Sequence, residues 1–169
     1  SFTNSIYENV TTNDDYLFIF DSDIVISNFT FLNCHSTSYL IKFTANRLTL
    51  TDSIIQITDL NPSSSTSCGA ILITSANSQT TITHSKFAST YSNGAIKTSD
   101  QVNSLSIEFC TFQACYGQES KYFDIKYSNE FVFKHNILSQ ARIEGGSNGK
   151  ITPPSSVTEY IFENITFTE

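Results

Sequence analysis

An eight-residue pattern recurs along the whole chain and constrains its fold more than any other feature. The pattern reads apolar–x–apolar–x–x–(Asn/Ser/Cys)–x–apolar. Copies span 48–55, 80–87, 105–112 and 131–138, the apolar positions recur in 24–31 and 160–167, and a partial copy spans 2–6. Short apolar patterns repeated in this way indicate a solenoid in which each copy belongs to one turn.

The spacing of the copies gives the length of one turn. The last apolar residues of successive copies are Ile6, Phe31, Ile55, Phe87, Phe112, Leu138 and Phe167, which lie 24 to 32 residues apart. A second apolar segment lies between copies, as in 17–20, 40–43, 70–73, 95–96 and 122–125. Each turn is therefore expected to hold three short strands, two from the pattern and one from this segment.

We predict an all-β fold, a right-handed parallel β-helix of about six to seven coils of 24–32 residues. Residues 1–169 are expected to form a single β-helix segment of a longer solenoid, because no polar capping element is visible at either end. An antiparallel sandwich is the alternative, but it does not predict an eight-residue pattern at a near-constant interval.

The pattern also predicts which side chains face inward. Positions one, three, six and eight are expected inside, whereas positions four and five are expected at an outward-facing bend. Small polar residues at an inward bend can bond the turn backbone or a stacked neighbour. We therefore predict an internal ladder at position six, formed by Asn4, Ser53, Ser85, Cys110 and Asn136.

Composition excludes several classes of function. The net charge is −7 and the chain contains no basic run, so nucleic acid is not an expected partner. No stretch reaches 18 uninterrupted apolar residues, so no transmembrane segment is expected in this chain. Charged residues make up only 15%, which leaves solubility to hydroxyl and amide side chains. No motif for a cofactor is present.

Two short motifs resemble those of a known family. Phe31-Leu-Asn-Cys34 and Phe112-Gln-Ala-Cys115 resemble the FxxN motif, with Cys in place of Asn, and Cys68-Gly-Ala-Ile71 and Asn93-Gly-Ala-Ile96 resemble the GGAI motif without its first Gly. Both motifs mark repeats of chlamydial polymorphic outer-membrane proteins and similar large surface proteins of protists. The resemblance implies a β-helix of the pectin-lyase-like type with a surface or adhesive role.

The four cysteines form no CxxC pair, so a zinc site is poorly supported. Cys34 and Cys68 lie in corresponding regions of adjacent coils, and we expect them to be the candidate disulfide. Cys115 matches Cys34 in register but lies three coils away, and Cys110 is expected to face inward.

Three sequons are candidate glycosylation sites: Asn9-Val-Thr, Asn28-Phe-Thr and Asn164-Ile-Thr. Asn28 and Asn164 occupy outward position five, where a glycan has room. His84 and His135 share that position but lie two coils apart, about 10 Å. They are therefore expected to be solvated surface residues and not ligands of a common metal ion.

The alternative to a structural role is an enzyme, because acidic polysaccharides are substrates of many β-helices. Such chemistry requires clustered carboxylates, with a basic residue for a lyase. Asp14, Asp15, Asp21 and Asp23 form the only acidic cluster, and no basic motif accompanies them.

We therefore expect a non-enzymatic structural or adhesive β-helix segment, extracellular or on the cell surface, that assembles end to end into filaments. Its expected partners are further coils of the same protein or copies of itself, with surface glycans or proteins as further candidates. The alternative is a β-helix that binds or cleaves polysaccharides in the manner of pectate lyases.

Overall fold

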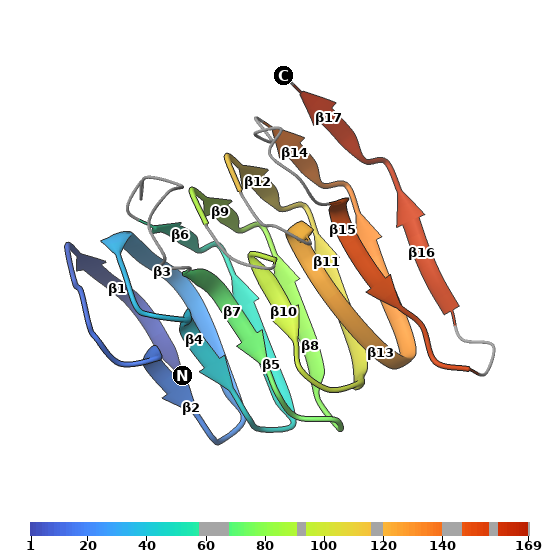
Figure 1. Ribbon diagram of the computed structural model, residues 1–169, viewed down its shortest axis with the longest axis horizontal. Helices are drawn as coiled ribbons and strands as arrows, with labels where there is room; N and C mark the ends of the chain where they lie inside the picture. The colour runs from blue at the N-terminus through green and yellow to red at the C-terminus, as the bar shows by residue number, and fades with distance from the viewer. Residues whose placement is uncertain (58–67, 91–93, 116–119, 140–146, 156–158, 169) are drawn as a thin grey trace.

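The computed structural model describes residues 1–57, 68–90, 94–115, 120–139, 147–155 and 159–168. These residues form a solenoid of strands without a helix (Figure 1). The strands are β1 (Phe2–Glu8), β2 (Tyr16–Phe20), β3 (Ile24–Cys34), β4 (Tyr39–Phe43), β5 (Arg47–Thr51), β6 (Ile54–Ile57), β7 (Gly69–Ile73), β8 (Gln79–Thr83), β9 (Lys86–Ala88), β10 (Ile96–Thr98), β11 (Val102–Glu108), β12 (Thr111–Gln113), β13 (Ser120–Lys134), β14 (Ile137–Ser139), β15 (Ser147–Thr152), β16 (Glu159–Glu163) and β17 (Thr166–Thr168).

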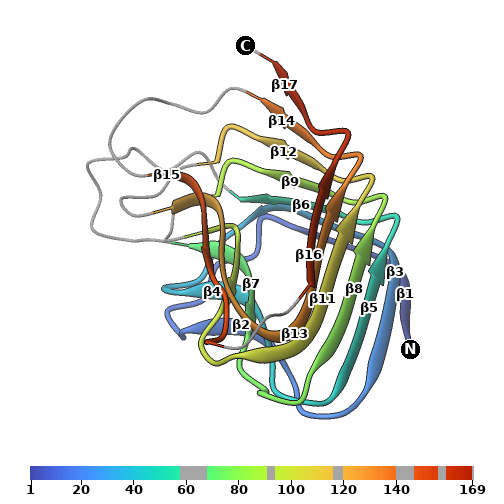
Figure 2. The same cartoon turned by 90° about the vertical axis from the view of Figure 1, so that its right-hand side faces the viewer.

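The strands line three faces of the solenoid, as Figure 2 shows in a view along the stack. The first face holds β5, β8, β11 and β16, the second holds β6, β9, β12, β14 and β17, and the third holds β2, β4, β7, β10 and β15. The long strands β1, β3 and β13 each run across two faces. Each recorded strand pairing between coils is parallel, so the predicted parallel β-helix with three strands per coil is confirmed.

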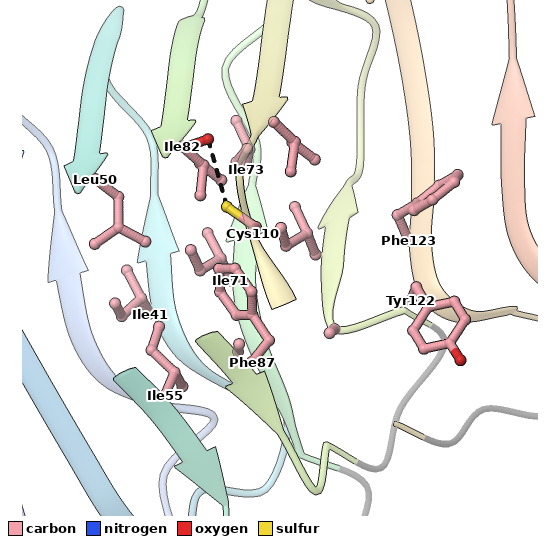
Figure 3. Packing of buried hydrophobic residues seen from close by; sticks show 14 of the residues in the cluster. Ile41, Leu50, Ile55, Ile71, Ile73, Ile82, Phe87, Cys110, Tyr122 and Phe123 are labelled. Carbon is pink, nitrogen blue, oxygen red and sulfur yellow. Dashed lines mark hydrogen bonds between the residues drawn. The ribbon is translucent and has the colours of Figure 1, made fainter. Parts of the chain in front are cut away.

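Equivalent positions of the pattern lie directly above one another. On the first face Leu48 pairs with Thr80, Thr80 with Leu105, and Leu105 with Phe131. Side chains alternate inward and outward along each strand, as in β8, where Thr80 and Ile82 are buried but Gln79 and Thr81 are exposed. The inward residues form one continuous apolar core, part of which is drawn in Figure 3.

Two corners of the coil are made by residues with left-handed backbone, which non-glycine residues rarely adopt. The first corner holds Asn4, Asn28, Asp52, His84, Phe109, His135 and Asn164, with φ of 49° to 55°. The second holds Asn9, Asn33, Ser89 and Ala114, with φ of 50° to 56°, and each lies five residues after a first-corner residue. In both corners the left-handed residue turns the chain so that the next residue points into the core.

The left-handed conformation explains why position five is so often Asn, Asp or His. Among non-glycine residues, these are enriched several-fold at positive φ. Sequence reasoning had assigned the turn chemistry to position six, but the structure places the left-handed backbone one residue earlier. The second corner was not predicted at all, although the interval of five residues from Asn4 to Asn9 and from Asn28 to Asn33 is visible in the sequence.

The predicted register of the first coil is wrong by one residue. Tyr7, and not Ile6, pairs with Phe31, and Ile6 remains 68% exposed. Asn4 therefore belongs to the outward corner and not to the internal ladder, and its Oδ1 accepts a hydrogen bond of 2.8 Å from Asn28 Nδ2. The error arose because Phe2, Ile6 and Tyr7 are all apolar, so a short copy fits the pattern in two registers.

The alternation along β8 can be tested with neighbouring substitutions. Ile82→Ala is expected to lower the free energy of unfolding by about 2 to 5 kcal/mol, because it leaves a cavity at a fully buried position. Thr81→Ala, one residue earlier on the exposed side, is the matched control and is expected to change stability by less than about 1 kcal/mol. Urea denaturation followed by circular dichroism measures both, and a reversed order of the two effects would rule out this register.

The left-handed corner predicts a difference between two substitutions of Asn28 in unglycosylated protein. Asn28→Val and Asn28→Gly both remove the hydrogen bond to Asn4, but only valine places a β-branched side chain at a φ of 50°. We expect the valine variant to be less stable than the glycine variant by at least about 1 to 2 kcal/mol, the cost of left-handed backbone. Equal stability in urea denaturation would contradict this conformation.

Candidate functional site

The internal ladder at position six runs through four buried side chains, Ser53, Ser85, Cys110 and Asn136. The backbone N–H of Ser53 donates to Ser85 Oγ at 3.2 Å, and that of Cys110 donates to Asn136 Oδ1 at 2.8 Å. Asn136 Nδ2 in turn donates to the carbonyl of Ile107 at 2.8 Å. The ladder therefore satisfies backbone groups that the first corner removes from the regular strand pattern.

A second ladder runs along the outside of the first corner. The rings of His84 and Phe109 stack with centroids 5.1 Å apart, and those of Phe109 and His135 with centroids 4.6 Å apart. Asn164 Nδ2 lies 3.3 Å from His135 Nδ1. The two histidines, expected to be separately solvated, are therefore joined through Phe109 into one aromatic stack.

The three sequon asparagines all lie at corners of the coil. Asn28 and Asn164 belong to the first corner and Asn9 to the second, and all three side chains are exposed. Asn9 Oδ1 accepts a hydrogen bond of 3.4 Å from Asn33 Nδ2, which repeats at the second corner the contact between Asn28 and Asn4. Their modification by glycans stays a prediction.

All four cysteines are free and buried, so the predicted disulfide between Cys34 and Cys68 is not formed. Cys34 pairs with Ile57 in the next coil, and Cys68 Sγ lies 3.5 Å from Ser36 Oγ. Cys110 Sγ points into the core and contacts the carbonyl of Ile82 at 3.7 Å (Figure 3). The cysteines therefore act as small core residues.

Burial also changes the acidity of the thiols. It raises the pKa of Cys110 to about 12 and that of Cys115 to about 11, because the core cannot solvate a thiolate. Burial raises the pKa of Cys34 and Cys68 as well. Since the thiolate is the reactive form, these side chains are poor nucleophiles in the folded protein.

The acidic cluster of the sequence is divided in space. Asp14 and Asp15 precede β2, while Asp21 and Asp23 follow it, so the two pairs lie roughly 16 to 20 Å apart. Asp15 Oδ1 accepts from Thr37 Oγ1 at 3.1 Å, and Asp23 Oδ1 accepts from the backbone N–H of Arg47 at 2.9 Å. These carboxylates bind adjacent coils to each other. Within the described residues no group of three or more His, Cys, Asp or Glu could hold a metal ion.

The outer side of the third face carries a row of lysines that sequence reasoning missed. Lys42 pairs with Leu72, Leu72 with Lys97, Lys97 with Asp124, and Asp124 with Lys150. Lysine thus recurs at every second coil. The signal in the sequence is a lysine beside an isoleucine of the third-face segment, as in Ile41-Lys42 and Ile96-Lys97.

The C-terminal end of the stack exposes the inward side chains of its last coil. Tyr160, Phe162 and Phe167 are 64%, 45% and 66% exposed, although the residues below them in the stack are buried. Phe162 and Phe167 line an open cavity of about 210 Å³ together with Phe133 and Leu138. Among the described residues, this end is an apolar surface on which β16 and β17 pair only with β13 and β14.

Gly94 is the one residue of the family-like motifs whose backbone requires glycine. Its φ is 98°, and a Cβ there would lie 2.8 Å from the backbone nitrogen of Asp124. Left-handed backbone and close approach between coils therefore coincide at this residue. Gly69, in the other GGAI-like motif, is the first residue of β7.

No protein-family model, curated protein or solved structure matches the chain. The described residues contain no helix long and apolar enough to cross a membrane. Neither finding identifies a family, so the functional argument depends on the geometry of the solenoid.

The buried thiols predict how the protein responds to alkali. Because the pKa of Cys110 is higher in the folded than in the unfolded chain, unfolding releases a proton above the ordinary value of 9.0, and stability falls as pH rises from 9 toward 12. Cys110→Ala is expected to show a smaller fall than the unmodified chain. Urea denaturation at pH values on either side of 9 measures this slope, and identical slopes in both proteins would contradict the assignment.

Proposed function

We propose that the chain is a non-enzymatic structural or adhesive segment, extracellular or on the cell surface, whose coils continue by stacking on further parallel coils. The observation that carries this proposal is the apolar C-terminal end, where ladders of constant register stop at exposed inward side chains. Tyr160, Phe162 and Phe167 occupy positions that are filled by buried residues one coil below.

The other end of the stack offers a surface of matching kind. Phe2, Tyr7 and Phe18 form an aromatic cluster that is only partly buried, with Tyr7 and Phe18 centroids 5.2 Å apart. When the C-terminal coil of one copy stacks on the N-terminal coil of another, Asn164 comes level with Asn4 and extends the first corner. A contact of this type joins different surfaces head to tail, so it generates a filament.

The extracellular or surface setting is supported by the composition and the motifs. Hydroxyl and amide side chains dominate the outward positions, and the sequon asparagines lie exposed at corners. The FxxN-like and GGAI-like motifs resemble those of polymorphic outer-membrane proteins, and in the structure they have definite roles. Phe31, Cys34, Phe112 and Cys115 all face the core, and Gly94 allows close contact between coils.

End-to-end stacking predicts concentration-dependent association of the purified chain. In analytical ultracentrifugation the unmodified chain is expected to form larger species as its concentration rises, and electron microscopy is expected to show rods that lengthen along the stack. Phe162→Asn combined with Phe167→Ser is expected to abolish association, because both exposed rings belong to the terminal coil.

A control variant separates this effect from general surface hydrophobicity. Ile54→Asn with Ile137→Ser changes two apolar residues that are 40% and 42% exposed on the side of the solenoid. This variant is expected to associate like the unmodified chain. Association that is lost equally in both variants, or a chain that stays monomeric at all concentrations, would contradict stacking through the ends.

A further inference from the structure

We propose that the outer side of the third face binds an extended acidic polysaccharide through a lysine column, defined as Lys42, Lys97, Lys126 and Lys150. This inference goes beyond the proposed structural role and does not depend on stacking of the ends. It assigns a binding surface and the chemical class of its ligand.

The register of the strands sets the spacing of the column. Lys42, Lys97 and Lys150 lie on β4, β10 and β15 and form one outward row, with a lysine at every second coil. In Figure 1 these three strands alternate with β7 and β13 along the stack. Two coils correspond to about 9.6 Å, twice the distance between paired strands. Lys126 lies on β13, two residues beyond Asp124 in the same strand. The charges are therefore spread along the solenoid over about 19 Å.

The local charge of this surface is opposite to that of the chain. The whole protein carries 16 acidic and 9 basic residues, for a net charge of −7. On the row that contains Lys42 the single acid is Asp124, whose side chain is 6% exposed and lies 3.6 Å from Lys97 Nζ. Lys126 lies in the neighbouring outward row, which also contains Asp21 at the level of Thr44. Four lysines less the two carboxylates of Asp21 and Asp124 leave two positive charges on these rows. A polyanion avoided by most of the surface is attracted here.

Contacts with the protein hold two of these ammonium groups near the surface. Lys42 Nζ lies 4.9 Å from the ring centroid of Tyr16, and Lys126 Nζ donates to the carbonyl of Ser99 at 3.2 Å. An ammonium has three N–H donors, so one such contact leaves others for a ligand. Side chains that are already restrained lose less conformational entropy on binding.

A row of hydroxyl groups runs beside the lysine column and favours a sugar as the ligand. Thr44, Thr74 and Ser99 follow Lys42, Leu72 and Lys97 by two residues, and so face the same side of their coils. Thr44 Oγ1 and Thr74 Oγ1 donate to the carbonyls of the coil below at 3.3 and 3.2 Å, which leaves their lone pairs as acceptors for sugar hydroxyls.

The spread of the charges distinguishes between ligands. A compact anion would contact one lysine at a time, whereas a linear polymer with a carboxylate or sulfate at regular intervals contacts several. The column contains no arginine for bidentate phosphate contacts, which makes it a poorer match for nucleic acid. An extended acidic polysaccharide is therefore the ligand whose charge and hydroxyl groups both fit.

The test uses the full chain with polygalacturonate, which carries carboxylates, and heparin, which carries sulfates as well. Neutral dextran and single-stranded DNA serve as comparison ligands. The variant is Lys42→Gln/Lys126→Gln/Lys150→Gln, with Lys97 kept because it pairs with the buried Asp124. The matched control, Arg47→Gln/Lys86→Gln/Lys134→Gln, removes the same charge from the other faces. Circular dichroism verifies that both variants are folded.

We expect the chain to bind at least one of the two acidic polysaccharides in biolayer interferometry at about 0.1 M salt, and to release it at about 1 M salt, where charges are screened within about 3 Å. The column variant is expected to bind about tenfold or more weakly, while the control variant keeps most of the affinity. Three outcomes would overturn the proposal: no binding to either acidic polysaccharide, equal weakening of both variants, or tighter binding to DNA than to polysaccharide.

Discussion

The parallel hydrogen bonding between successive coils is the interaction on which this structure depends. It holds paired strand residues above their equivalents in the coil below, with local register shifts in β3, β11 and β13, so the apolar positions form one core and the polar positions one surface. A slip of one residue would turn Leu105 and Ile107 outward and bring Ser106 and Glu108 into the core. The ladders at the first corner reinforce this register, because Ser53, Ser85, Cys110 and Asn136 bond the backbone of the neighbouring coil or of their own.

The fold was predictable because both of its determinants are local patterns. Alternation of apolar and polar residues predicts strands, and repetition of that alternation at one interval predicts coils. The first coil shows the limit of this reasoning. A short copy with apolar residues at Phe2, Ile6 and Tyr7 fits two registers, and only pairing with the complete second coil decides between them.

Features that depend on contacts between different faces were not accessible in the same way. Cys34 and Cys68 lie in corresponding regions of the sequence, but both thiols are free, and Cys68 Sγ contacts Ser36 Oγ. The acidic residues from Asp14 to Asp23 are close along the chain, yet a full strand lies between the two pairs. Net charge was a similarly poor guide, because it averages over faces and so conceals the lysine column in an acidic protein.

The backbone of the solenoid places few demands on its outward side chains, so different residue types occupy equivalent outward positions of successive coils. At the first corner the chain requires a left-handed residue, but Asn28, Asp52, His84 and Phe109 all meet that requirement. The left-handed backbone of Phe109 costs conformational free energy, and the ring of Phe109 stacks between those of two histidines. The same freedom applies to the outer row of the third face, where Leu72 and Asp124 stand among lysines on strands of identical register. A charge pattern there adds nothing to the core, so its regular spacing is better explained by what lies outside the protein than by folding.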